Sequence, residues 1–403
     1  MDKKPEKLVP EVRFKGFTDD WEQHKLGGVA KIIGGGTPNT KIPAYWNGTI
    51  NWYTPVEIGK KIYINESQRK ITLDGLKHSS AKLLPKNSVL FTSRAGIGKM
   101  AILGEEATTN QGFQSIIPIA KELDSYFLFS LSNQLKYYGE THGAGSTFTE
   151  ISGKELAKFK LILPKLNEQK IISKLIMMMD KLISLQQRKL NQLKRLKRAM
   201  LQQLFVDKNC KQPILRFKNF NDNWEERKLS DIANYRNGKA HEQYIDMNGI
   251  YTVVNSKFIS TNGKVKKFSN KPIELLKKGE IAFVLSDVPN GKALAKAYLI
   301  DSDNRYSLNQ RIAGITPSSD INSYFLYILM NRNRYFLKFD DGVGQTNLSK
   351  KDIEEFKENY PLFDEQQKIA NLFSKIQILI TLQQNKLTQL TTLKKYLLQK
   401  LFI

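Results

Sequence analysis

The chain has 403 residues, of which 40% are hydrophobic and 10% aromatic. This is enough for two or three domains with packed cores, which excludes a wholly disordered chain. The 63 Lys and Arg residues outnumber the 39 Asp and Glu residues, so the formal net charge is +24. A surplus of this size exceeds what solubility requires and favours a polyanionic partner, with nucleic acid as the first expectation.

Cysteine and histidine usage predicts neither a disulfide nor a metal site. Cys210 is the single cysteine and cannot form an intrachain disulfide. The four histidines are widely scattered: His24, His78, His142 and His241. The first ten residues lack the apolar stretch of a signal peptide, and no run of about 18 apolar residues occurs. We therefore expect a cytoplasmic, metal-free protein that does not span a membrane.

The first segment with a recognisable pattern, the first opening segment, covers residues 10–26 and carries spaced apolar anchors. Its key residues are Arg13, Phe14, Phe17 and Trp21. We expect these four, with their counterparts in the second half of the chain, to be packing anchors where each domain begins.

The region from about 30 to 150 predicts a mixed α/β domain with short strands. Runs rich in β-branched and aromatic residues predict strands at 50–53, 88–92 and 116–119, and residues 126–135 predict a helix. Ser152, followed three residues later by Glu155, has the pattern of a helix N-cap, and so does its match in the second half of the chain, Ser349 with Asp352.

The first closing segment, residues 164–206, contains a predicted long helix at 168–205. Apolar residues recur mostly three or four positions apart, and this stretch contains neither Gly nor Pro. Asn167 is the expected N-cap, and Asp364 with Gln367 has the capping-box pattern for the matching helix in the second half of the chain. At 1.5 Å per residue such a helix spans about 57 Å, which is too long to be covered by one small domain.

The second half of the chain repeats this plan. The opening pattern returns at an offset of 203 residues as Arg216, Phe217, Phe220 and Trp224. Strands are predicted at 251–254 and 281–285, and a helix at 324–331. The closing pattern returns without gaps at an offset of 197, from Pro164 and Glu168-Gln169 to Pro361 and Glu365-Gln366. Matched ends around divergent middles indicate one scaffold that carries two different recognition surfaces.

These patterns predict an α+β protein of two similar mixed α/β domains, at 1–163 and 207–360. The domains are separated by two long helices, within 164–206 and 361–403. Two leucine-striped helices of this length are expected to bury their stripes on each other as an antiparallel coiled coil, which gives a pseudo-twofold symmetric chain.

A search for catalytic motifs gives no convincing active site. The Gly-rich run at 34–38 breaks the dinucleotide-binding pattern, and the run at 96–99 lacks the upstream glycine of a phosphate loop. No Asn-Pro-Pro-aromatic segment, which amino-methyltransferases use on a flipped base, is present.

One combination superficially resembles a metal-nuclease site. Glu355 and Lys357 lie downstream of Asp340 and Asp341. The matched residues of the first copy are Lys158 and Lys160, however, and Glu-x-Lys is expected by chance in a chain so rich in lysine. We therefore expect this chain to be noncatalytic.

The doubled Arg-Phe-x-x-Phe-x-x-x-Trp opening, the Pro-x-x-x-Glu-Gln motifs at Pro164 and Pro361, and the two long helices resemble the specificity subunit of type I restriction-modification enzymes. The likeness covers the chain from about residue 10 to its end. Residues 35–38, Gly-Gly-Thr-Pro, with the aromatic run at 45–52, also look like one common class of target-recognition domain. The second domain lacks this run, so its half-site should differ.

The resemblance implies a division of labour. Each variable domain would read one half of a split DNA target, the helices would act as a ruler that sets the gap, and two modification subunits would dock on the helical region. Methyl transfer, ATP-driven translocation and cleavage would belong to partner subunits. S-adenosylmethionine, ATP and Mg would then be used there, and this chain would carry no cofactor.

Candidate DNA-binding residues come from the divergent middles. Arg and Lys suit guanine, whereas Asn and Gln suit adenine. The candidates for base edges are Arg94, Lys99, Arg236, Asn237, Lys239 and Lys292. The candidates for phosphates or base edges are Thr37, Tyr53, Thr147, Thr346 and Asn347. Asn110-Gln111 and Asn309-Gln310 occur in both copies, which favours a structural turn or a shared phosphate contact.

Two other functions remain open at this point. A stand-alone bipartite DNA-binding regulator would bind its target tightly without any partner. An autonomous nuclease would cut DNA in the presence of a metal ion and would depend on Glu355 and Lys357.

Overall fold

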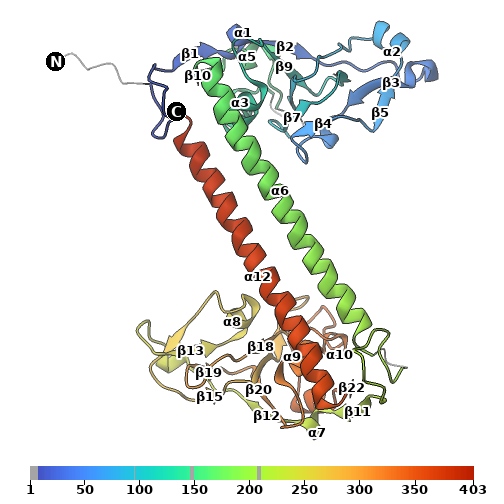
Figure 1. The fold of residues 1–403 in the computed structure, drawn as a ribbon, viewed down its shortest axis with the longest axis vertical. Coiled ribbons are helices and arrows are strands. Elements are labelled where there is room, and N and C mark those ends of the chain that lie inside the picture. The colour runs from blue at the N-terminus through green and yellow to red at the C-terminus, as the bar shows by residue number, and fades with distance from the viewer. Residues whose placement is uncertain (1–7, 95, 146–148, 207–209) are drawn as a thin grey trace, which may run out of the picture. The chain divides into compact units, whose positions relative to one another are not determined.

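The computed structural model describes residues 8–94, 96–145, 149–206 and 210–403 (Figure 1). The chain forms two compact units, one made of Met1–Gln187 with Asn385–Ile403 and the other of Arg188–Gln384. Each unit thus contains one α/β domain and a part of both long helices. Within the described ranges, no helix combines the length and the apolar character needed to cross a membrane.

The first domain contains two small sheets. The larger has the strand order β2-β9-β6-β7-β4, and the smaller has the order β5-β3-β8, in which β3 is parallel to β8 and antiparallel to β5. The strands are β2 (Ala30–Gly34), β3 (Trp46–Tyr53), β4 (Tyr63–Ile64), β5 (Arg69–Ile71), β6 (Val89–Phe91), β7 (Met100–Leu103), β8 (Ala107–Thr109) and β9 (Gln114–Pro118). The strands predicted at 50–53, 88–92 and 116–119 are confirmed as parts of β3, β6 and β9.

Helices and a short strand pair complete this domain. The helices are α1 (Leu26–Val29), α2 (Leu73–Lys77), α3 (Ser125–Ser130), α4 (Ser132–His142) and α5 (Gly153–Leu156), with 3-10 turns at Pro43–Tyr45 and Pro55–Glu57. Strands β1 (Glu22–Lys25) and β10 (Lys160–Leu163) pair antiparallel and join the two ends of the domain. The helix predicted at 126–135 is two helices, because the chain bends at Leu131 between two serines, a residue type whose hydroxyl competes for backbone hydrogen bonds.

The second domain repeats this topology. The order β12-β20-β16-β18 matches β2-β9-β6-β7, and the order β14-β13-β19-β15 again contains one parallel pair, β13 with β19. The strands are β11 (Glu225–Lys228), β12 (Ala233–Asn237), β13 (Tyr251–Val254), β14 (Phe268–Ser269), β15 (Leu275–Leu276), β16 (Ile281–Val284), β17 (Ser286–Asp287), β18 (Ala297–Leu299), β19 (Tyr306–Leu308), β20 (Ile312–Pro317), β21 (Thr346–Asn347) and β22 (Lys357–Tyr360). The helices are α7 (Leu229–Ile232), α8 (Ser256–Ser260), α9 (Ser323–Met330), α10 (Arg334–Leu337) and α11 (Lys350–Glu354), with a 3-10 turn at Glu242–Tyr244.

Both faces of each central strand are buried. In β6, Val89 and Phe91 belong to one apolar core, whereas Leu90 belongs to another on the opposite face. In β16, Phe283 likewise belongs to one apolar core and Ala282 to another on the opposite face. Because side chains alternate along a strand, a strand covered on both faces has a continuous apolar sequence, as β6 and β16 do.

The long helices α6 (Leu166–Gln203) and α12 (Phe363–Lys400) each have 38 residues. The expected caps, Asn167 and Asp364, lie inside the first turn instead, because the carbonyls of Lys165 and Leu362 already accept the first helical hydrogen bonds. The predicted caps of the short helices before them are confirmed: the hydroxyls of Ser152 and Ser349 accept from backbone N–H groups three residues on.

Within each unit the two long helices run antiparallel. In one unit Lys394, late in α12, forms an ion pair with Asp180 in the first half of α6. In the other, Nζ of Lys197, late in α6, donates to Oε1 of Gln377 in α12 at 2.7 Å. Burial lowers the pKa of Lys197. These contacts confirm the antiparallel pairing that the leucine stripes predict.

The opening and closing motifs meet in a buried ion pair in each domain, which we call the clamp. Arg13 donates from Nε and Nη2 to the two carboxylate oxygens of Glu168 at 2.7 and 2.8 Å. Arg216 binds Glu365 in the same way at 2.9 and 2.8 Å. The Glu side chains are only 2% and 1% exposed, so the two paired hydrogen bonds compensate for the loss of water around each charge.

The glutamine that follows each clamp glutamate fastens the helix to its domain. Gln169 accepts from the backbone N–H of Asp124 and donates to the carbonyls of Glu122 and Pro164. Gln366 makes the same contacts with Asn322, Asp320 and Pro361. Asp124 and Asn322 are the N-caps of α3 and α9, so each glutamine ties the long helix to the start of a core helix.

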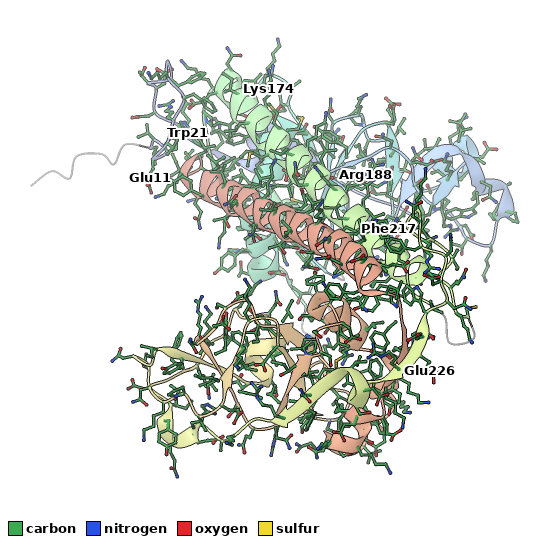
Figure 2. All side chains as sticks on the ribbon, turned by 60° about the horizontal axis from the view of Figure 1, so that its bottom comes forward. Glu11, Trp21, Lys174, Arg188, Phe217 and Glu226 are labelled. Atoms are coloured by element: carbon green, nitrogen blue, oxygen red, sulfur yellow. The ribbon has the colours of Figure 1, made fainter. Side chains whose placement is uncertain are left out.

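Each domain also packs against the far end of a long helix. Phe402, after α12, packs on Phe127 at 4.9 Å between ring centroids, and Glu11 and Trp21 lie beside the last turns of α12 (Figure 2). In the second unit, Phe205 stacks on Phe325 at 5.3 Å and meets Trp224. Backbone hydrogen bonds match as well, from Val12 to Lys400 and from Leu215 to Gln203. Trp21 and Trp224 are thus buried in the two cores, and Phe14 and Phe217 pack against these cores, which confirms these four as packing anchors.

The clamp predicts a large effect of one substitution on stability. Arg216→Met should lower the free energy of unfolding of the second unit by about 3–5 kcal/mol, because Glu365 would be left buried without a partner. Urea titration followed by tryptophan fluorescence, with Trp224 in the affected core, measures the change.

The matched control is Glu354→Gln, which removes the exposed ion pair between Lys350 and Glu354. Exposed pairs of this kind contribute little, so the control should not shift the unfolding midpoint measurably. Equal effects of the two substitutions would show that the clamp is not a main support of the fold.

Candidate nucleic-acid interface

In the first domain, the Gly-Gly-Thr-Pro run follows β2 and lies against Asn110-Gln111. The Thr37 hydroxyl donates to Oε1 of Gln111. A Cβ atom on Gly35 would lie 1.9 Å from the carbonyl oxygen of Asn110, and one on Gly36 would lie 2.3 Å from the backbone nitrogen of Ala81. The two glycines therefore allow the backbones to approach closely, and Thr37 is half-buried at their end.

Arg94 and Lys99 lie in the loop between β6 and β7. The Thr92 hydroxyl organises this loop, since it donates to the carbonyl of Gly96 and accepts from the N–H of Lys99. Arg94 is 4.0 Å from Glu150, and Lys99 is exposed. Thr147, the other candidate of this region, lies outside the described residues.

In the second domain, Arg236, Asn237 and Lys239 lie at the end of β12. Arg236 donates to both carboxylate oxygens of Glu280 and to the carbonyl of Leu275. Glu274 pairs with Arg236 at 3.2 Å and with Lys239 at 3.1 Å. Asn237 is exposed. Although burial disfavours the charge of Glu280, hydrogen bonds from Arg236 and Thr316 outweigh it and hold the pKa of Glu280 below its usual range.

Lys292, Thr346 and Asn347 come together in a second group. Strand β17 pairs with β21, which places Asp287 opposite Thr346 and Ser286 opposite Asn347. The Asp287 carboxylate accepts from the N–H groups of Ala293 and Leu294 and so holds the turn that carries Lys292. Lys292 and Asn347 are exposed, whereas Thr346 is 7% exposed.

The same backbone contact organises these loops in both domains. The N–H of Ile151 donates to the backbone carbonyl of Ser93 in the first domain, and the N–H of Leu348 donates to the backbone carbonyl of Leu285 in the second. By this match Arg94 corresponds to Ser286, and Glu150 corresponds to Asn347. Equivalent loops on one scaffold therefore carry different side chains, as two different recognition surfaces require.

Two candidates have placements that favour a structural role. Tyr53 is 1% exposed inside an apolar core, where burial and the nearby Glu57 and Glu66 raise its pKa to about 12. Arg236 is held by Glu280 and Glu274. The remaining described candidates, Thr37, Arg94, Lys99, Asn237, Lys239, Lys292, Thr346 and Asn347, stay predictions.

The search for loop residues missed a cation–aromatic group in the first domain. The guanidinium of the exposed Arg69 lies 3.8 Å from the centroid of the Trp46 ring, and His78 stacks on Tyr45 at 5.6 Å with nearly parallel rings. Stacked aromatic and guanidinium planes suit contacts with bases. The aromatic run at 45–52 is the sequence signal for this group, but nothing in it indicates that Arg69 joins from β5.

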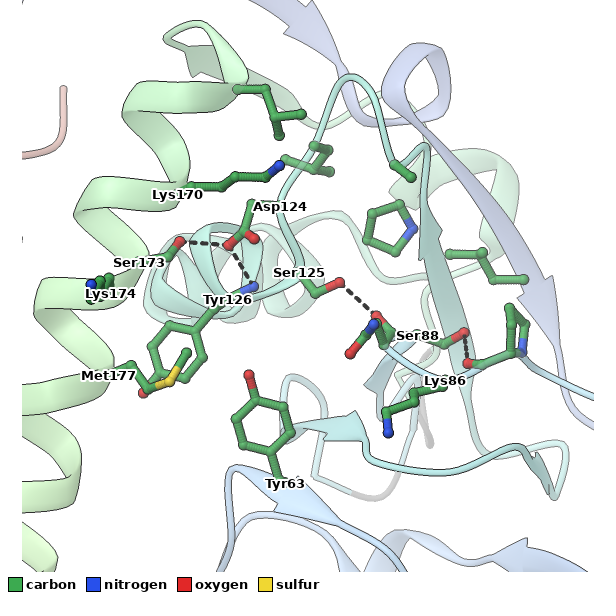
Figure 3. A pocket seen from close by; sticks show the side chains of 17 residues that line it. Tyr63, Lys86, Ser88, Asp124, Ser125, Tyr126, Lys170, Ser173, Lys174 and Met177 are labelled. Atoms are coloured by element: carbon green, nitrogen blue, oxygen red, sulfur yellow. Dashed lines mark hydrogen bonds between the residues drawn. The ribbon is translucent and has the colours of Figure 1, made fainter.

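A cavity of about 480 Å³ lies where α6 meets the first domain (Figure 3). Asp124 accepts there from the N–H of Tyr126 and the hydroxyl of Ser173, which fixes one wall. Lys86, Lys170 and Lys174 also line the cavity and make its rim basic.

The nuclease combination does not assemble. Glu355 pairs with Lys228 at 3.1 Å, and Lys357 pairs with Glu226 at 3.0 Å, so both residues tie the opening strand β11 to β22 and its preceding turn. In the described part of the chain, no three His, Cys, Asp or Glu residues group in a way that could hold a metal ion.

The two domains share one topology and the same clamp, but the side chains of their loops differ. This pattern is typical of a duplicated recognition protein. The family model of the type I restriction modification DNA specificity domain matches residues 18–195 and 221–392, which begin at the same offset of 203 as the opening segments. The chain therefore belongs to the family of type I restriction-modification specificity subunits.

Individual proteins agree with this assignment. The chain is 29% identical to the MjaIX specificity subunit of Methanocaldococcus jannaschii, over 93% of this chain and 90% of that protein. It is 32% identical to the EcoR124I/EcoR124II specificity subunit of Escherichia coli over 42% of this chain and 43% of that protein. The S subunit from M. genitalium has the same fold, with a TM-score of 0.66 at 18% identity, over 98% of this chain and 99% of that one.

Glu280, the buried carboxylate that pairs with Arg236, predicts a pH-dependent contribution to the stability of the second unit. A carboxylate whose folded pKa is depressed contributes stability above its unfolded pKa of about 4.3, and this contribution is lost as pH falls through the folded pKa. Glu280→Gln should therefore destabilise the second unit at pH 7, and the difference from the unaltered protein should shrink below about pH 4. Chemical unfolding at several pH values tests this, and a pH-independent difference would contradict it.

Proposed function

We propose that this chain is the DNA-recognition subunit of a type I restriction-modification complex and that each domain reads one half of an asymmetric, bipartite target. The observation that carries the proposal is the contrast between matched scaffolds and unmatched loops. The clamps of Arg13 and Arg216 are alike in geometry, whereas the loop positions Arg94 and Ser286 differ. The net charge of +24 supports DNA as the partner.

We further propose that α6 and α12 set the gap between the half-sites. Each has 38 residues without Gly or Pro, so neither helix contains a residue that favours a kink. Fixed spacing of two readers yields a fixed number of intervening base pairs. A change in helix length should alter the gap and leave the half-sites unchanged.

The helices are also the proposed docking surface for two modification subunits. On α6 the exposed apolar residues Ile171, Met178 and Leu185 are seven positions apart, the spacing of a coiled-coil seam. Leu185 and its matched residue Leu382 are 52% and 59% exposed. Leu196 and Leu393 are a second matched exposed pair, whereas the residues that match Ile171 and Met178 are Lys368 and Lys375. The two matched apolar pairs suit two copies of one partner and favour a subunit of a complex over a stand-alone regulator.

The chemistry in this proposal belongs to the partners. S-adenosylmethionine would supply the methyl group, and ATP and Mg would serve the translocating and cleaving subunits. This chain would contribute binding and positioning through its loops and helices.

Mapping of methylated adenines tests the proposed function. The chain would be co-expressed with its modification subunit in a methylation-free host, and genomic methylation would be mapped by single-molecule sequencing. We expect a split motif with a fixed gap. Replacing residues of about 30 to 150 by those of another specificity subunit should change one half of the motif only.

A chain carrying a conservative surface change, Lys121→Arg, is the matched control and should leave both halves unchanged. An ungapped motif, or one that the domain replacement does not alter, would refute the two-reader arrangement. Tight specific binding by this chain alone, without methylation in the complex, would support the regulator.

The docking surface predicts an assembly defect. Leu185→Glu together with Leu382→Glu should weaken binding of modification subunits by about tenfold or more, because a charge would replace an apolar contact. Sedimentation of the mixed subunits measures assembly.

The control places glutamate at an exposed apolar residue away from the helices, Val56→Glu, where 76% of the residue is exposed. It should assemble normally. Normal assembly of the double helix variant would place the docking surface elsewhere.

A further inference from the structure

Arg311 has an unusual backbone conformation for its residue type. Nine non-glycine residues in the described part of the chain have positive φ, and six of them are asparagine, which tolerates this region. The other three are Ala295, Arg311 and Arg332, and the φ of Arg311 is 64°.

Arg332 makes structural hydrogen bonds through both its backbone and its side chain, whereas the side chain of Arg311 makes none with any residue that the structure describes. The N–H of Arg332 donates to the carbonyl of Ala295 at 2.7 Å, and its guanidinium donates to Leu294 at 3.0 Å. Arg311 is exposed, and among the described residues no group forms a hydrogen bond or ion pair with its guanidinium. A non-glycine residue held at positive φ stores strain, and such residues are concentrated at functional sites.

Arg311 is the third residue of a tight turn, in which the N–H of Ile312 donates to the carbonyl of Asn309 at 3.3 Å. Positive φ at this place in a turn normally selects glycine. The matched residue of the first domain is Gly112, which does not share the positive φ, and a Cβ there would lie 2.8 Å from Cγ of Pro55. The second domain thus places a side chain where the first has no room for one.

This turn lies between the two groups of candidate residues in the second domain. The N–H of Gln310 donates to the carbonyl of Lys239 at 3.0 Å, on one side. On the other side, the carbonyl of Arg311 accepts from Leu285 at 3.0 Å, and the carbonyl of Leu285 accepts from Leu348, which follows Asn347. The turn is therefore bonded through its backbone to both loops, by Gln310 on one side and by Arg311 on the other.

We propose that Arg311 is a specificity-determining residue that reads a guanine in the half-site of the second domain. A guanidinium pairs with O6 and N7 of guanine through two hydrogen bonds, and this is the commonest specific contact in the major groove. An exposed arginine without a protein partner is available for this contact, unlike Arg236, which Glu280 holds. The inference rests on the proposed function and assigns a base-reading residue within it.

Arg311→Gly tests the assignment in the complex with modification subunits. Methylation mapping should show that one G·C position in one half-site becomes degenerate, while the other half-site stays unchanged. Binding to target DNA, measured by fluorescence anisotropy, should fall about ten- to hundredfold, while binding to unrelated DNA changes little. Because glycine adopts positive φ without strain, the melting temperature should not fall.

Two further variants separate the explanations. Arg305→Gly removes an exposed positive charge elsewhere in the domain, and it should leave the motif intact. Arg311→Lys keeps the charge and can still donate to guanine, so it should retain the motif but bind target DNA less tightly than arginine does. An unchanged motif with glycine, together with an equal loss of binding to target and unrelated DNA, would indicate a phosphate contact and overturn base reading.

Failure of the proposed function gives a different result. It would be seen with the unaltered chain, as the absence of any gapped motif, and the assignment of Arg311 would fall with it. A gapped motif in the unaltered chain that the Arg311 variants do not affect would overturn only the assignment.

Discussion

The clamp between opening arginine and closing glutamate is the interaction on which the rest of each unit depends. It joins residues 155 positions apart in the first domain and 149 apart in the second. A buried carboxylate is costly unless it is fully paired, so this contact fixes the start of each long helix against the start of its domain. The neighbouring glutamine then aligns the core helix, and the strands and loops follow from that alignment.

This arrangement separates the supporting contacts from the loops that we propose to read DNA. The clamps, the glutamine contacts and the aromatic anchors are matched between the domains, and all lie at the junction with the long helices. The candidate loop residues follow other strands: Arg94 and Lys99 lie between β6 and β7, Lys292 lies between β17 and β18, and Asn347 ends β21. Loop side chains can therefore differ between the domains without disturbing the packing at the helices.

The strained turn at Arg311 illustrates the proposed separation of recognition from stability. The first domain has Gly112 at the matched position and gains close packing against Pro55. The second domain carries an exposed arginine in a conformation that glycine would adopt more readily. A scaffold held by buried ion pairs and apolar cores tolerates such a local cost, and strained residues of this kind are concentrated at functional sites.

The duplication, the two long helices and the central strands were predictable from the sequence, because periodicity and repeated motifs are local properties of the chain. Its net charge of +24 favours a polyanionic partner. The sequence could not determine which arginines are engaged inside the fold. Arg236 and Arg94 look alike in sequence, yet only Arg236 receives a buried carboxylate, Glu280, from 44 positions away. Long-range pairing, the burial of Tyr53 and the backbone conformation of Arg311 depend on how distant segments pack, and only the tertiary structure decided them.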